Sequence, residues 1–305
     1  MASSEQYRQQ VRLLMRLLPL VAEEPCFALK GGTAINLFVR DLPRLSVDID
    51  LVYLPVNERP EALADIDTTM KRIEARVMAA IPNAMISRTV REDTILRLAV
   101  RAERTQVKIE VSPVLRGVVQ EPVLRSVSPA VEDEYGFAEI QLVSFADLYA
   151  GKLVAALDRQ HPRDLFDVRD LLANEGLTPE LREAFLVYLI SHDRPMAEVL
   201  SCRFKDIAAT FADNFEGMTE APVTLAELEA VREELVRLLI AEMPDHHKAF
   251  LLGFEARSPD WDMLSYPHIA ELPAVKWRQR NLDMLDAEKR DRLVAALREA
   301  LAWQG

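Results

Sequence analysis

The first half of the chain contains six short runs of apolar and β-forming residues that predict strands. The runs cover residues 26–30, 48–54, 84–90, 94–100, 106–112 and 138–142. A helical repeat over residues 60–80 separates the second run from the third. We therefore predict that the first half of the chain forms a mixed sheet flanked by helices.

From residue 144 onward the pattern changes to one amphipathic helix after another, with prolines and glycines marking the breaks. The fold class predicted for the whole chain is α/β of the α+β kind. It has an N-terminal mixed-sheet domain, residues 1–143, and a C-terminal helical bundle, residues 144–305. Clefts between domains commonly hold substrates, so we expect the active site at this boundary.

An apolar run near the N-terminus is interrupted by Arg12 and Arg16. It therefore predicts an amphipathic helix, and neither a signal peptide nor a membrane span. The two cysteines, Cys26 and Cys202, are far apart in sequence and show no metal-binding spacing. These features favour a cytoplasmic protein with no membrane partner.

The chain has 305 residues and a formal net charge of −12, which argues against a protein that coats nucleic acid through its overall charge. A local basic surface is compatible with that charge. Six basic residues are concentrated in one stretch, namely Arg88, Arg91, Arg97, Arg101, Arg104 and Lys108. They could guide an RNA end, or they could simply be charged strand edges.

Two elements with candidate chemistry follow the first predicted strand. Gly31 and Gly32 let backbone N–H groups approach a phosphate closely, and the hydroxyl of Thr33 can add a donor. Asp48 and Asp50 stand two residues apart on a predicted strand, so their carboxylates project from one face and can share hard cations such as Mg²⁺. Each element alone is common in ordinary structure. Together, in this order, they indicate a metal-dependent site for nucleotidyl transfer.

The run KGGTAINLF, residues 30–38, followed by RLSVDIDL, residues 44–51, resembles the first motif of the AbiEii/AbiGii nucleotidyltransferase toxin family, which includes MenT-like toxins. That family is a branch of the DNA polymerase β-like nucleotidyltransferase superfamily. The resemblance implies a nucleotidyltransferase fold for the first domain, with Asp48 and Asp50 as metal ligands. The residues that it places at the nucleotide are Lys30, Gly31, Gly32, Thr33 and Ser46.

A third carboxylate is implied by the same resemblance. Residues 106–112 read as a strand that Pro113 closes, and Glu110 on this strand is the best candidate by position. In the superfamily such a carboxylate helps to hold the metal and can deprotonate the attacking hydroxyl. The alternative is an exposed strand glutamate beside an exposed Lys108.

A further motif begins with Lys152 and Arg159, which are seven residues apart and so share one face of a predicted helix. Pro162 suits the first turn of the following helix, where the N-terminus also favours the carboxylate of Asp164. An ordinary capped helix would account for these residues equally well.

The same stretch, KLVAALDRQHPRDLFDV, is similar to the later motifs of the toxin family. The resemblance implies that Lys152 contacts nucleotide phosphate, and it adds Arg159 and Arg163 as further contacts. It also implies that Asp164 or Asp167 belongs to the catalytic centre. The ordinary alternative for the last part is an ion pair between Arg163 and Asp167, four residues apart on a helix.

The resemblance implies a toxin of a toxin–antitoxin system. With Mg²⁺ or Mn²⁺, such an enzyme moves a nucleotide from an NTP to an RNA acceptor, the tRNA 3′ end in MenT-type members, and so blocks translation. A cognate antitoxin is implied, with or without direct contact. Two alternatives stay open: nucleotidyl transfer to a protein or small-molecule hydroxyl, and a module that binds nucleotide or a partner without catalysis. The intact carboxylates, glycine turn and Lys152 count against the second.

Overall fold

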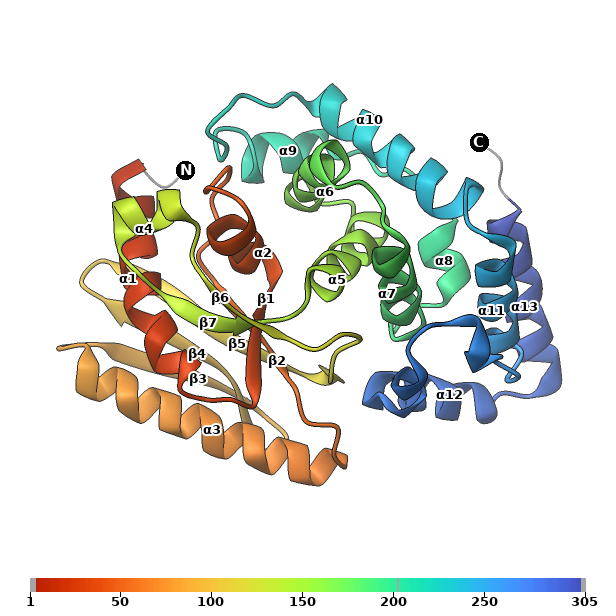
Figure 1. The fold of residues 1–305 in the computed structure, drawn as a ribbon, viewed down its shortest axis with the longest axis horizontal. Coiled ribbons are helices and arrows are strands. Elements are labelled where there is room, and N and C mark those ends of the chain that lie inside the picture. The colour runs from red at the N-terminus through yellow and green to blue at the C-terminus, as the bar shows by residue number, and fades with distance from the viewer. Residues whose placement is uncertain (1–3, 202, 303–305) are drawn as a thin grey trace. The chain divides into compact units, whose positions relative to one another are not determined.

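The computed structural model describes residues 4–201 and 203–302. It divides into two compact units, Met1–Ser144 and Phe145–Gly305, whose helices and strands are drawn in Figure 1. Each unit has its own buried apolar residues. The first unit contains a mixed sheet with flanking helices, and among the described residues of the second unit the regular elements are helices joined by loops. The predicted fold class is confirmed.

Among the described residues of the first unit, seven strands form one sheet in the order β3-β4-β5-β2-β1-β7-β6. The strands are β1 (Phe27–Lys30), β2 (Ile49–Tyr53), β3 (Met85–Arg91), β4 (Thr94–Ala102), β5 (Thr105–Arg116), β6 (Val123–Ser126) and β7 (Glu139–Leu142). Strand β2 pairs antiparallel with β1 and parallel with β5. The centre of the sheet therefore joins strands that are far apart in sequence.

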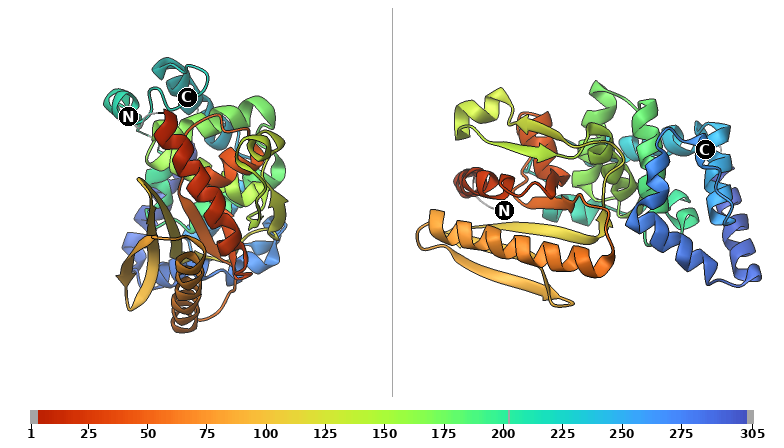
Figure 2. Two further views of the ribbon diagram at one scale, coloured as in Figure 1. Left: turned by 90° about the vertical axis from the view of Figure 1, so that its left-hand side faces the viewer. Right: turned by 60° about the horizontal axis from the view of Figure 1, so that its bottom comes forward.

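The helices of the first unit are α1 (Ser4–Ala22), α2 (Gly31–Ala34), the π-helical segment η1 (Ile35–Val39), α3 (Arg59–Ala80) and α4 (Pro129–Tyr135). Figure 2 shows α3 lying along the sheet. Arg72 and Arg76 of α3 both bind the carboxylate of Glu24, just after α1, which places α1 and α3 side by side. Arg88 of β3 reaches Glu74 of α3, so this face of the outer strands is the one that α3 covers.

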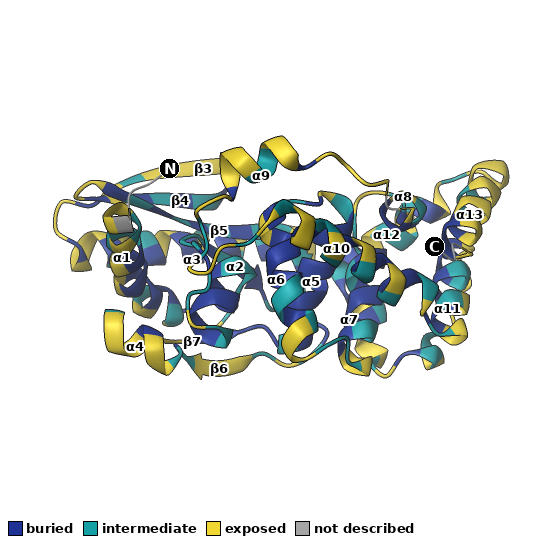
Figure 3. Ribbon diagram, turned by 90° about the horizontal axis from the view of Figure 1, so that it is seen from above, coloured by how far each residue is buried: buried dark blue, intermediate teal, exposed yellow. Residues whose placement is uncertain are grey.

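Strands β4 and β5 show the alternation that the sequence predicted. Leu98 and Ile109 are register partners on the face that α3 covers, and both are fully buried. Their neighbours Arg97 and Glu110 project from the opposite face and are half-buried. The outer strand β3 is exposed along most of its length, as Figure 3 shows. One face of this part of the sheet is therefore apolar and covered, and the other is polar.

The second unit consists of short helices around a buried pair. Its elements are α5 (Phe145–Asp158), α6 (Pro162–Asn174), α7 (Pro179–Ile190), α8 (Met196–Leu200), α9 (Ala208–Asn214), α10 (Leu225–Val236), η2 (Arg237–Ala241), α11 (Asp245–Glu255), η3 (Trp261–Met263), η4 (Pro267–Glu271), α12 (Pro273–Asp283) and α13 (Ala287–Leu301). Most residues of α5 and α6 are buried, and their ribbons are largely dark blue in Figure 3.

Among the described residues, none of the helices is long and apolar enough to cross a membrane.

The structure corrects three details of the predicted strands. Strand β5 does not end at Pro113 but continues to Arg116, with an irregular register against β2 after Val52. Strand β2 begins at Ile49, so Asp48 lies in the segment that leads into the strand. Strand β6 was not predicted, because its residues are exposed or only partly buried and show no alternation.

Candidate active site

Four charged residues lie next to one another across the sheet of the first unit. In the strand register Lys30 of β1 is opposite Asp50 of β2, and Asp50 is level with Glu110 of β5. Glu110 is in turn opposite Arg97 of β4. Because register partners project from the same face of a sheet, the side chains form one row with a lysine and an arginine at its ends and two carboxylates between them.

The glycine turn predicted from the sequence lies directly over this row. Strand β1 ends at Lys30, and Gly31 begins α2 with a φ of +79°, a conformation that strongly favours glycine. A Cβ placed on Gly31 would lie 2.5 Å from Oδ2 of Asp50, and one on Gly32 would lie 2.7 Å from Oγ of Ser46. A side chain at either position would therefore displace side chains of candidate site residues, and at Gly31 it would also meet an unfavourable φ.

Hydroxyl and amide groups hold the segment between the turn and β2. The hydroxyls of Thr33 and Ser46 lie 3.3 Å apart, within hydrogen-bond distance. The side-chain amide of Asn36 donates to the carbonyl oxygen of Gly32 over 2.7 Å, and its oxygen accepts from the backbone N–H of Arg44 over 3.3 Å. The segment that carries Ser46 is thus tied to the helix that begins at the glycines.

Sequence reasoning missed Asn36 and Arg44, although both lie inside the motif that pointed to this site. Arg44 is 3% exposed, and its guanidinium donates to the carbonyl oxygen of Leu45 over 3.0 Å. A Cβ on Gly32 would also lie 2.7 Å from Nη2 of Arg44. An arginine directly before the Leu-Ser-x-Asp-x-Asp run was the available signal.

The two ends of the row have different electrostatic surroundings. Burial lowers the pKa of the Lys30 ammonium, and the nearby carboxylate of Asp50 partly opposes this shift. At the other end, Nε of Arg97 lies 2.6 Å from Oε1 of Glu110, and Nη2 donates to Oε2 over 3.2 Å. The third carboxylate is therefore held by a cross-strand guanidinium.

The donor set at Asp48 and Asp50 fits a hard divalent cation that arrives with a nucleotide. Mg²⁺ is usually held by one or two carboxylates, with substrate phosphates and water completing its coordination. Within the described part of the chain, no three His, Cys, Asp or Glu side chains are grouped closely enough to hold a metal by themselves. Glu110 is engaged with Arg97, so its assignment as a metal ligand stays a prediction.

A second cluster lies inside the second unit. Lys152 of α5 places Nζ 2.8 Å from Oδ1 of Asp164 and 3.0 Å from Oδ2 of Asp167, both on α6. The side chains are 9%, 2% and 1% exposed, respectively. A buried lysine between two buried carboxylates forms a tight ionic network that joins α5 to α6.

Arg159 gives this buried network an exposed end. Its guanidinium donates to both oxygens of Asp164, at 2.5 and 3.0 Å, while 62% of its side chain is exposed. Burial alone would raise the pKa of Asp164, but the charges of Lys152 and Arg159 outweigh it and hold that pKa well below the usual range.

The turn between the two helices agrees with the predicted helix start. Pro162 is in the first turn of α6, and the ring nitrogen Nδ1 of His161 accepts a hydrogen bond from the backbone N–H of Arg163 over 3.1 Å. Asp164 lies in the first turn, as expected from the favourable position of a carboxylate near a helix N-terminus. His161 is thus a helix cap that the sequence did not reveal.

The mixed sheet, the glycine turn and the adjacent carboxylates define the class of a nucleotidyltransferase. A family model described as "Nucleotidyl transferase AbiEii toxin, Type IV TA system" matches residues 12–299. The chain belongs to this family, which confirms the resemblance seen in the sequence. It is a nucleotidyltransferase toxin of a type IV toxin–antitoxin system.

A solved structure shares the fold. The chain is similar to MenT4, the nucleotidyltransferase toxin Rv2826c from Mycobacterium tuberculosis H37Rv, with a TM-score of 0.55 and 18% sequence identity. The similarity covers 99% of this chain and 94% of the MenT4 chain. Among proteins with curated descriptions, none matches significantly.

Proposed function

We propose that this toxin transfers a nucleotide from an NTP to a hydroxyl of RNA, with the tRNA 3′ end as acceptor, and thereby blocks translation in the cytoplasm. The observation that carries the proposal is the contact between the glycine turn and Asp50, within a row that continues to Glu110. Such a turn offers backbone donors to phosphates directly beside the carboxylates that a phosphate-bound cation needs.

Mg²⁺ or Mn²⁺ would be held by Asp48 and Asp50, and when bound it would neutralise charge on the phosphates and on the leaving group. The chain itself supplies the phosphate-binding turn at Gly31 and Gly32. The hydroxyl of Ser46 lies within hydrogen-bond distance of Thr33 and close to Gly32 of that turn. These groups position the triphosphate, and positioning supplies a large part of the acceleration in phosphoryl chemistry.

In the proposed reaction the acceptor hydroxyl oxygen forms a bond to the α-phosphorus of the NTP. The bond between the α-phosphorus and its bridging oxygen breaks, and pyrophosphate leaves. We assign the proton of the hydroxyl to Glu110, whose carboxylate lies level with Asp50 across β2 and β5. Arg97 then acts as a positioning residue, because it fixes the orientation of Glu110.

In the second unit we propose that Arg159 and Arg163 contact nucleotide phosphates. The support is the exposure of the Arg159 guanidinium, which a ligand can reach. Lys152, Asp164 and Asp167 are proposed as further members of the catalytic machinery, and their ionic network keeps Arg159 in place.

The test is to incubate purified protein with total tRNA, Mg²⁺ and each α-labelled NTP in turn, and to separate the products on a denaturing gel. We expect label on tRNA for the wild type, and none for Asp48→Ala or Asp50→Asn. If label appeared on protein or on an added alcohol while tRNA stayed unlabelled, the acceptor would be that hydroxyl and not RNA. Unchanged cellular toxicity of Asp48→Ala and Lys152→Ala would contradict a catalytic function altogether.

A further inference from the structure

Two basic residues of the outer strands are neutralised by a carboxylate partner. Arg88 is paired with Glu74, and Arg97 is paired with Glu110. Arg101, Arg104 and Lys108 differ, because among the described residues no carboxylate lies within ion-pair distance of any of them. Uncompensated cations grouped on one strand pair of a chain with net charge −12 are evidence for an anionic ligand.

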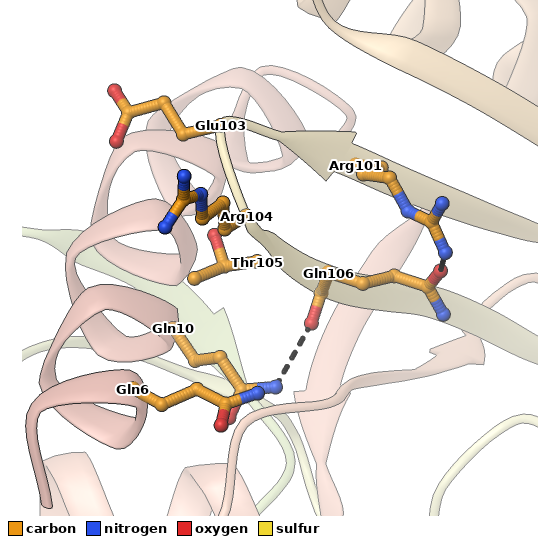
Figure 4. A pocket seen from close by; sticks show the side chains of 7 residues that line it. All are labelled: Gln6, Gln10, Arg101, Glu103, Arg104, Thr105 and Gln106. Atoms are coloured by element: carbon orange, nitrogen blue, oxygen red, sulfur yellow. Dashed lines mark hydrogen bonds between the residues drawn. The ribbon is translucent and has the colours of Figure 1, made fainter. Parts of the chain in front are cut away.

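Two of these cations border a polar hollow of about 420 Å³ at the turn between β4 and β5. The hollow is lined by Gln6, Gln10, Arg101, Glu103, Arg104, Thr105 and Gln106 (Figure 4). Gln10 donates to the carbonyl oxygen of Gln106 over 3.2 Å, which ties α1 to the turn. Figure 4 shows Arg104 on the side of the two α1 glutamines, while Glu103, the one acidic residue of the lining, points away from them.

The cations continue from this hollow towards the catalytic row. In the register of β4 and β5, Ala99 is opposite Lys108, so Lys108 projects from the same face as Glu110. The two residues are two positions apart on one strand, a distance of roughly 7 Å. Arg101 lies further along the same face, opposite Gln106. The cations therefore follow the strand pair up to the site.

We propose that Arg101, Arg104 and Lys108 form a phosphate-binding surface for the RNA acceptor, here called the ribbon surface. The proposal rests on the proposed function and adds the place where the acceptor backbone binds. An acidic protein repels a polyanion at long range, so it needs a local cationic surface to bind RNA. Guanidinium and ammonium groups with no internal carboxylate partner are free to make such phosphate contacts.

The test measures RNA binding without NTP or metal, so that it is independent of transfer. Fluorescence anisotropy of 5′-labelled tRNA is followed over a salt series for the wild type and for the triple variant Arg101→Gln, Arg104→Gln, Lys108→Gln. The matched control is Arg125→Gln, an exposed arginine on β6 at the opposite edge of the sheet. Urea unfolding of each variant checks that the fold is kept.

We expect the triple variant to bind more weakly, with its slope of log affinity against log salt reduced by about 2, or roughly 0.7 for each lost single-strand phosphate contact. Arg125→Gln should keep the wild-type slope. A wild-type slope in the triple variant, with wild-type protein still labelling tRNA, would overturn the ribbon surface alone. No labelling of RNA by the wild type would overturn the proposed function, and the ribbon surface with it. If Arg125→Gln weakened tRNA binding as much as the triple variant, binding would depend only on overall charge, and the proposed ribbon surface would be wrong.

Discussion

The carboxylate of Asp50 occupies the space that a side chain on residue 31 would need, since a Cβ on Gly31 would lie 2.5 Å from Oδ2 of Asp50. This close approach joins the glycine turn, proposed to bind phosphate, to the carboxylate proposed to hold the metal. A substitution at either residue therefore acts on the other.

Gly31→Ala should disturb both the turn and Asp50. The φ of +79° costs an alanine about 1 kcal/mol of folding free energy, and the steric overlap displaces the carboxylate as well. We expect nucleotide transfer to fall by at least about 100-fold, in line with the loss from small misplacements of reacting groups. The matched control is Gly176→Ala, where φ is +71° but nothing lies within 4 Å. It should lose stability in urea unfolding and keep its transfer rate per folded molecule; equal losses of activity would contradict the steric explanation.

Glu110→Gln and Arg97→Gln separate a catalytic carboxylate from an ordinary strand ion pair. The pair is partly exposed, so each substitution should cost no more than about 1 kcal/mol of stability. If Glu110 receives the proton, transfer by Glu110→Gln should fall by about 100-fold or more, and the pH dependence of the rate should change. The transfer rate of Arg97→Gln should fall by less than about tenfold, because Arg97 only orients Glu110. Equal small effects on the rate would identify Glu110 as the exposed strand glutamate that the sequence left open.

Lys152→Met should be strongly destabilising, because it removes the ammonium that lies between two buried carboxylates. Breaking a buried ionic network in this way typically costs about 3–5 kcal/mol. The control is Lys289→Met, whose exposed pair with Asp286 should contribute no more than about 1 kcal/mol. Urea unfolding measures the loss of stability in both variants. The transfer rate per folded molecule then shows whether Lys152 also contributes to catalysis. A Lys152→Met variant as stable as Lys289→Met would argue against the network.

Acid should destabilise the protein partly through Asp164. The pKa of Asp164 in the folded state lies well below its unfolded value of about 3.9. The carboxylate therefore stabilises the fold fully above about pH 3.9, and this stabilisation is lost as the pH falls towards the folded-state pKa. We expect Asp164→Asn to be less stable at neutral pH. Its unfolding free energy should also vary less with pH than the wild type's between about pH 5 and pH 2. Asp193→Asn, at a side chain 94% exposed, is the control and should follow the wild-type curve. Parallel curves for wild type and Asp164→Asn would contradict the shift.

Much of the fold was readable from local pattern. The repeat over residues 60–80 is found as α3, and all six predicted runs overlap strands, because the pattern of apolar positions in a strand is a local property. The exceptions have physical causes. The exposed β6 has no apolar face to reveal it, and Pro113 lies within the long β5 instead of ending it.

The sequence by itself determined which chemistry is present: a glycine turn followed by two aspartates, with Lys152 and Asp164 in a later motif. Tertiary structure decided which groups meet. Glu110 comes beside Asp50 only because β2 pairs in parallel with a strand some 60 residues away, and that register has no local signal. The same pairing and packing neutralised Arg88 and Arg97 but left Arg101, Arg104 and Lys108 without carboxylates. Spacing along a chain fixes the face on which a side chain lies, whereas its partner depends on the strand or helix that packs against it.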